Sequence, residues 1–265
     1  MALKPIYTLE NVRPVSEIRY DWSGWLRNSA SFPSTLEIAT ENLNDAWGRD
    51  GLTLETFSVE GNQIQCLFRA NQDVSPSLCA ARAKGRLQNE LRTLGTEVKF
   101  DRRVSVRALG DNTTTIVQNY IRKQVGKSDY IDPRFKDHLG QFTVEAATRI
   151  LENPSVSGHG RYWYNLHVVI VVQDRRYPIT RNENFAKVSD TIFRIAKKKS
   201  HAVASAAVMP DHIHIALRAN HTHTPSEVAL AYLNNLSYIL GYNECWSTEF
   251  YVGTFSEYDV RAVMH

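Results

Sequence analysis

Two stretches of the chain, VMPDHIHIALRAN at residues 208–220 and VEGNQIQCLFRAN at residues 59–71, align with each other without a gap. The same register continues downstream, where Ser75-Pro76-Ser77 lies over Thr224-Pro225-Ser226. After a small gap the match returns, and Phe100, Val104, Val106 and Ala108 lie over Trp246, Phe250, Val252 and Thr254. A repeat of this length changes the expected architecture. We therefore interpret the chain as a duplication of one folding unit.

The second copy has the pattern of a β-α-β-β-α-β unit. A β-branched run predicts a buried strand, helical spacing of apolar residues predicts a helix, and a Thr-Pro-Ser-Glu sequence predicts a capped helix start. In order, the predicted elements are strand 166–172, a helix with Phe185, Val188, Ile192 and Ile195 on one face, strands 202–208 and 212–218, a helix from Thr224-Pro225-Ser226-Glu227 to Gly241, and strand 250–254. This order is that of the ferredoxin-like arrangement.

The first copy follows the same order. Its predicted elements are a helix with Leu36, Ala39, Leu43 and Trp47 on one face, strands 53–59 and 63–69, a helix after Ser75-Pro76, and a strand near 103–109. The fold class is therefore predicted as α+β, with two ferredoxin-like halves forming a pseudo-two-fold dimer within one chain. The predicted domains are residues 1–128, a connector at 129–159, and residues 160–265.

One further helix is predicted in the first copy, from Thr114 to about Val125. Asp111-Asn112-Thr113 can cap its start, and Ile116, Tyr120 and Gln124 are spaced four apart on one face. The connector carries a short amphipathic segment, 143–151.

Composition is that of an ordinary globular protein. The chain has 265 residues, 43% of them hydrophobic, and a net charge of +3, which does not by itself indicate a nucleic-acid binder. Three scattered cysteines, Cys66, Cys79 and Cys245, do not make a disulfide framework or a zinc cluster. We expect no membrane span, no signal peptide and a cytoplasmic protein.

The sequence His212-Ile213-His214 places two imidazoles on one face of a strand, because side chains alternate with period two. Two neutral imidazoles can converge on one divalent ion. The alternative is a pair of exposed strand histidines. His221 and His223 are interpreted as polar loop residues.

Met209-Pro210-Asp211-His212-Ile213-His214 resembles the signature of the single-tyrosine HUH transposases, which include insertion-sequence and REP-associated enzymes that cut and join single-stranded DNA. Residues 246–254 resemble the segment that precedes the nucleophile helix of that family. The helix itself reads roughly Ile-x-x-x-Tyr-Ile-x-x-Gln, and residues 116–124 fit that pattern, although they lie in the first copy.

The resemblance implies a metal-dependent nicking and strand-transfer enzyme. Tyr120 would attack the phosphate and form a 5′-phosphotyrosine, and His212, His214 and Gln124 would hold Mg²⁺ or Mn²⁺. Single-stranded or hairpin DNA would be the partner, and the chain would act as a monomeric pseudodimer. The basic residues expected to contact DNA are Arg102, Arg103, Arg122, Lys123, Lys197 and Lys198.

Each copy departs from the family pattern in a different place. The first copy has Gln63 and Gln65 where the histidines should stand, and in the second copy Val263 is the residue nearest the expected tyrosine. A complete site therefore requires Tyr120 to cross to the second half.

Other interpretations stay open at this point. One is decay of both copies without activity, and a second is a non-catalytic protein that binds DNA hairpins. A third is a metal-dependent nuclease that uses activated water. Tyr251 and Tyr258 are alternative nucleophiles.

Overall fold

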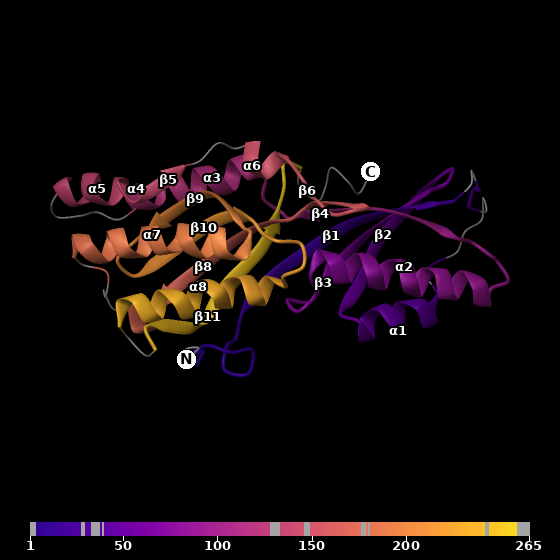
Figure 1. Ribbon diagram of the computed structural model, residues 1–265, viewed down its shortest axis with the longest axis horizontal. Coiled ribbons are helices and arrows are strands. Elements are labelled where there is room, and N and C mark those ends of the chain that lie inside the picture. Colours follow the sequence, from indigo (N-terminus) through magenta and orange to yellow (C-terminus); the bar gives the residue numbers. More distant parts are fainter. Residues whose placement is uncertain are drawn as a thin grey trace.

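The computed structural model describes residues 4–27, 30–32, 38, 40–127, 133–145, 149–175, 179, 181–241 and 244–258 (Figure 1). The first half contains β1 (Val15–Leu26), α1 (Glu41–Arg49), β2 (Leu52–Glu60), β3 (Gln63–Ala70), α2 (Pro76–Thr93) and β4 (Phe100–Leu109). The second half contains β8 (Asn165–Val172), a 3-10 turn at Gln173–Arg175, α7 (Asn182–Lys199), β9 (Ala202–Val208), β10 (His212–Arg218), α8 (Pro225–Leu240) and β11 (Trp246–Phe255). The predicted α+β class is confirmed.

Among the described residues, seven short elements run between the halves. They are α3 (Thr114–Arg122), α4 (Gln124–Lys127), α5 (Pro133–Gly140), β5 (Thr143–Glu145), α6 (Arg149–Glu152), β6 (Ser155–Val156) and β7 (Gly160–Trp163). Figure 1 shows the halves side by side, with α3 beside the strands of the second half and away from α1 and α2.

The strands of both halves join one mixed sheet. Its main path is β5-β9-β10-β8-β11-β1-β4-β7-β6, and β3 pairs with β1 and carries β2 on its other side. Within the first half the strand order is β4-β1-β3-β2, and within the second it is β11-β8-β10-β9. The two halves thus share one element order and one strand order.

The halves meet through equivalent residues. The start of β1 pairs in parallel with β11, where Val15 lies opposite Tyr251, and β7 pairs in parallel with β4, where Arg161 lies opposite Ser105. Two backbone bonds are also reciprocal, because Ser77 N donates to His221 O and Ser226 N donates to Gln72 O, each at 3.1 Å. In the alignment of the two copies Ser77 lies over Ser226 and Gln72 over His221.

Alternation along the strands separates the core from the site. Ile213 and Ile215 of β10 are fully buried in the main core, together with Val188 and Ile192 of α7. His212 and His214 alternate with them and therefore face the other side of the sheet. The helices α7 and α8 cover the first side, so the second side is where functional side chains can gather.

Most predicted elements of the repeats are present, with shifted ends. The Thr224–Glu227 capping box and the Gly241 helix end are confirmed. Helix α1 begins at Glu41 behind Thr40, and the predicted positions Leu36 and Ala39 lie outside the described residues.

Other predictions need correction. The predicted helix from Thr114 to Val125 is interrupted, since α3 ends at Arg122 and a short helix restarts at Gln124. The predicted amphipathic segment at 143–151 begins as strand β5, which pairs with β9, and ends in α6; residues 146–148 lie outside the described residues. No strand was predicted at the position of β1.

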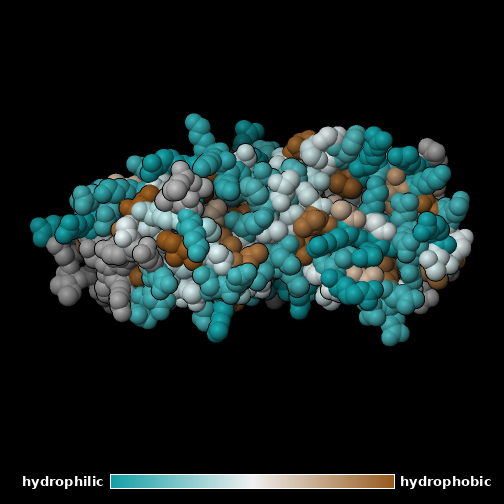
Figure 2. Space-filling model, turned by 60° about the horizontal axis from the view of Figure 1, so that its bottom comes forward, coloured by the Kyte–Doolittle hydropathy of each residue, from teal (hydrophilic) through white to brown (hydrophobic). Residues whose placement is uncertain are grey.

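No described helix is long and apolar enough to cross a membrane. On the face drawn in Figure 2, hydrophobic residues form small separate patches between hydrophilic ones.

Candidate functional site

Helix α3 is attached to the second half by its apolar face. Val117 and Ile121 pack with a group of small residues on β9 and β10, namely Ala204, Ala207 and Ala216, and with Leu151 and Phe255. Ile121 is fully buried. Small side chains on the sheet let the helix approach closely, so the short apolar face of α3 is enough to hold it there.

Tyr120 lies on α3 beside this apolar face, and the residue is 43% exposed. Its ring centroid lies 5.3 Å from that of His214 and 6.1 Å from that of His167, both in edge-to-face geometry. The structure therefore brings a tyrosine of the first half next to a histidine of the second half, as the composite arrangement requires.

The two histidines of β10 lie close together on one face of the sheet. Their ring centroids are 5.0 Å apart, His214 is 3% exposed, and His212 is partly exposed. Nδ1 of His212 lies 2.6 Å from Oδ1 of Asp211, and Nδ1 of His214 lies 3.1 Å from Nε2 of His167. Since both Nδ1 atoms are engaged in this way, Nε2 is the nitrogen through which each imidazole would bind an ion.

His167 was missed by sequence reasoning. It lies on β8 opposite Ala216, on the same face of the sheet as His214. Desolvation of the ring lowers the pKa of His167 to about 4. The alternation of side chains in residues 166–172 sets His167 and Val169 on one face of the strand. Only the register between β8 and β10, which the sequence does not give, shows that this face lies beside His214.

Residues 161–265 match a family model described as "Transposase IS200 like". This match covers the second half of the chain. No curated protein matches the chain. One similar structure is described as a "putative transposase" from Deinococcus radiodurans, with 21% identity, 42% of this chain and 92% of that chain covered, and a TM-score of 0.33. Another is a REP-associated tyrosine transposase bound to a REP hairpin, with 10% identity, 38% and 61% covered, and a TM-score of 0.31.

A metal site beside the histidines of β10 would have two imidazoles and the carboxamide of Gln124 as donors. Gln124 is 5% exposed, and its Nε2 donates to the backbone oxygen of Tyr120 at 3.0 Å, which leaves the amide oxygen as the atom that could face an ion. Three protein donors would leave positions for water and phosphate oxygens on an octahedral ion. Among the described residues, no group of three or more His, Cys, Asp and Glu side chains is placed to hold a metal. The donor set thus depends on Gln124.

The corresponding positions of the first half have different chemistry. Gln65 Nε2 donates to Oδ2 of Asp21 at 2.9 Å, and Gln63 Oε1 accepts from the indole nitrogen of Trp25 at 3.2 Å. Burial raises the pKa of Asp21 to about 6. These side chains bond to one another in pairs, and imidazoles are absent from the motif positions of this half.

The alternative nucleophiles have different surroundings. Tyr251 donates to Oε2 of Glu17 at 3.2 Å, and burial together with this carboxylate raises the pKa of Tyr251, which disfavours a phenolate. Tyr258 is 52% exposed and its ring lies 5.6 Å from the guanidinium of Arg107.

The predicted DNA-binding residues fall in three places. Arg122 and Lys123 lie at the end of α3 beside the site, although Arg122 is paired with Glu145 at 2.7 Å. Arg102 and Arg103 are exposed on β4 of the first half. Lys197 and Lys198 end α7, on the side of the sheet opposite to the histidines. The structure therefore does not bring these two lysines to the site.

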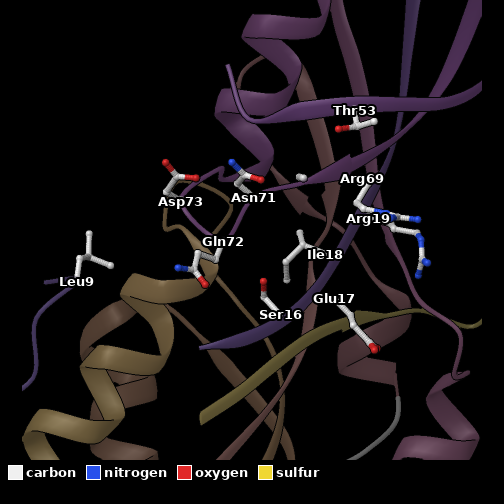
Figure 3. Close-up of a pocket in the computed structure, with 11 residues that line it drawn as sticks. Leu9, Ser16, Glu17, Ile18, Arg19, Thr53, Arg69, Asn71, Gln72 and Asp73 are labelled. Atoms are coloured by element: carbon white, nitrogen blue, oxygen red, sulfur yellow. The ribbon is translucent and has the colours of Figure 1, made fainter. Parts of the chain in front are cut away.

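A hollow of about 760 Å³ lies where the halves meet, and it is not lined by Tyr120, Gln124 or the histidines of β10 (Figure 3). Arg19 and Arg69 line one side of it, and Gln72 and Asp73 line the other. Glu55 is paired with both arginines, at 3.3 and 2.7 Å, and Asp111 is paired with Arg19 at 3.2 Å. Two carboxylates thus compensate the two positive charges, and the hollow is not an evident anion site.

Proposed function

We propose that this chain is a metal-dependent DNA nicking and strand-transfer enzyme of the single-tyrosine HUH type, with one composite active site. Its residues are Tyr120 from the first half and His212, His214 and Gln124 around the proposed ion. The observation that carries the proposal is the 5.3 Å distance between the rings of Tyr120 and His214. The match of residues 161–265 to IS200-like transposases supports the same reaction class.

The reaction is a transesterification. The hydroxyl oxygen of Tyr120 attacks the scissile phosphorus, the bond from phosphorus to the 3′ oxygen breaks, and a 5′-phosphotyrosine and a free 3′-hydroxyl result. Attack by another 3′-hydroxyl reverses these steps and joins strands, so no nucleotide cofactor is needed. A bound Mg²⁺ or Mn²⁺ would polarise the phosphate oxygens. The exposed position of Tyr120 leaves room for a DNA strand beside the histidines.

We further propose that the halves are two ferredoxin-like copies that together form a pseudodimer. The shared strand order and the reciprocal bonds of Ser77 and Ser226 support this. In such an arrangement α3, the tyrosine helix of the first copy, packs on the second copy, which is the copy that retains the histidines. The proposed partner is single-stranded or hairpin DNA.

The second candidate is a non-catalytic protein that binds DNA hairpins. The loss of histidines at Gln63 and Gln65 favours it, because this half has already exchanged the motif residues for a side-chain network. The first candidate forms a covalent bond between the protein and DNA, and the second does not.

The test uses labelled single-stranded and hairpin oligonucleotides from DNA flanking the gene, incubated with the protein and Mn²⁺. Denaturing gels should show a covalent protein–DNA adduct that is lost in Tyr120→Phe. Tyr251→Phe is the matched control and should keep the adduct. Binding without any adduct under these conditions would favour the second candidate.

A further inference from the structure

His214 forms a hydrogen bond with His167, a residue that is not part of the motif at residues 209–214. The rings are stacked at 21° with centroids 5.3 Å apart, and Nε2 of His167 lies 3.1 Å from Nδ1 of His214. Only one of the two nitrogens can carry the shared proton. Which one does so decides whether His214 has its lone pair on Nε2, where an ion would bind, or on Nδ1.

The neighbouring histidine shows which arrangement suits a ligand. Nδ1 of His212 faces a carboxylate oxygen of Asp211 at 2.6 Å. An ionised carboxylate only accepts hydrogen bonds, so a neutral His212 ring beside it carries its proton on Nδ1 and its lone pair on Nε2. Histidines that bind metals usually donate their other ring N–H to such an outer partner.

The first half contains a bond at the equivalent place. Strand pairing sets Asp21 opposite Leu67 and His167 opposite Ala216, which makes Asp21 the counterpart of His167 and Gln65 the counterpart of His214. Gln65 Nε2 donates to Asp21 Oδ2 at 2.9 Å. In the first half, therefore, Asp21 on β1 accepts a hydrogen bond from Gln65, the residue at the position of His214.

We infer that His167 is a positioning residue whose Nε2 accepts a hydrogen bond from Nδ1–H of His214, and so holds His214 in the tautomer with its lone pair on Nε2. The role as ligand support rests on the proposed function. The tautomer itself is a property of the metal-free protein and can be measured without any activity.

The test combines two measurements on the full chain. Long-range ¹H–¹⁵N NMR of the metal-free protein at neutral pH reports the tautomer of His214, assigned with His214→Gln, and electron paramagnetic resonance reports Mn²⁺ binding. The variants are His167→Leu, which removes the acceptor, and His167→Gln, whose amide oxygen can replace Nε2. Val169→Ala is the control, since Val169 lies directly opposite His214 and offers no hydrogen bond.

We expect the Nδ1–H tautomer in the wild type and in Val169→Ala. His167→Leu should populate the Nε2–H tautomer and weaken Mn²⁺ binding by about 10- to 100-fold, and His167→Gln should restore most of both. An Nε2–H tautomer in the wild type would overturn the inference, whether or not the leucine variant folds. Three imidazoles on bound Mn²⁺ would also overturn it, because His167 would then be a ligand. The expected tautomer in a protein that does not bind Mn²⁺ would support the inference and contradict the proposed function.

Discussion

Tyr120 of α3 and His214 of β10 belong to different halves of the chain, yet their rings meet edge to face with centroids 5.3 Å apart. The contact depends on the apolar face of α3, which packs Val117 and Ile121 against the alanines of β9 and β10. The position of the proposed nucleophile is therefore a packing property of one short helix, and changes in that packing should change the chemistry.

Ile121→Ala should lower the free energy of unfolding by about 2–5 kcal/mol, because it leaves a cavity under α3. It should also reduce adduct formation, because α3 would no longer hold Tyr120 beside His214. Ile121→Val should cost only about 0.5–1.5 kcal/mol. Urea denaturation gives both values. The control is Ile116→Ala on the same helix, where the side chain is 51% exposed and the expected change is within about 0.5 kcal/mol. An equal loss for Ile116 and Ile121 would contradict the packing of α3.

Replacing the partly exposed His212 by alanine should abolish Mn²⁺ binding and adduct formation while the melting temperature stays close to that of the wild type. EDTA should stop adduct formation in the wild type and leave binding of single-stranded DNA, which a filter or fluorescence assay would show. His159→Ala, at an exposed position outside the site, should behave as the wild type. Adducts that form normally in His212→Ala would remove the histidines from the mechanism.

Asp21 gives a prediction for the pH dependence of stability. Burial raises the pKa of its carboxyl in the folded protein to about 6 from 3.8. The folded state then binds more protons than the unfolded state between these values, so this group's contribution to stability is full below pH about 4 and is lost as pH rises to about 6.

Asp21→Asn should remove the loss of stability that Asp21 causes as pH rises. The variant should gain at most about 3 kcal/mol relative to the wild type at pH 7, and the difference should shrink toward pH 4. Unfolding free energies measured at a series of pH values test this. A difference that does not change between pH 4 and 7 would show that Asp21 titrates normally.

Much of this architecture could be predicted from the sequence because the repeat and the alternation of apolar residues are local signals. The strands around 208–220 and 59–71, and the capped start of α8, were found in this way. Strand β1 was not, because the alignment of the two copies begins only at residue 59. The alternation of Ile18, Tyr20 and Trp22 with polar residues was a usable signal, and the strand is paired with β3 and β4 on both sides.

The candidate site was predictable only in part. Tyr120, His212 and His214 carry motif signals, whereas His167 enters through cross-strand register and Lys197 and Lys198 were placed by charge alone. Clustered lysines do not reveal which side of a sheet their helix covers. The break in the helix before Gln124 was likewise not visible in its spacing of four residues.

The different positions of the basic residues lead to a prediction about salt. Lys123→Ala, beside the site, should reduce the slope of log affinity against log salt for single-stranded DNA by about 0.7, the value for one phosphate contact. Lys197→Ala with Lys198→Ala should leave adduct formation unchanged, because these side chains lie on the other face of the sheet. Affinity titrations at several salt concentrations measure the slopes. A loss of adducts in the double variant would contradict this placement.

The most direct measurement is the identity of the tyrosine that carries DNA. Adducts formed by the wild-type chain are digested with nuclease and protease, and mass spectrometry locates the remaining 5′-nucleotide. The composite site predicts Tyr120 as the modified residue, and mixing full-length Tyr120→Phe with His212→Ala should not restore adducts if both parts act within one chain. A nucleotide on Tyr251 or Tyr258, in the same half as the histidines, would contradict the composite site.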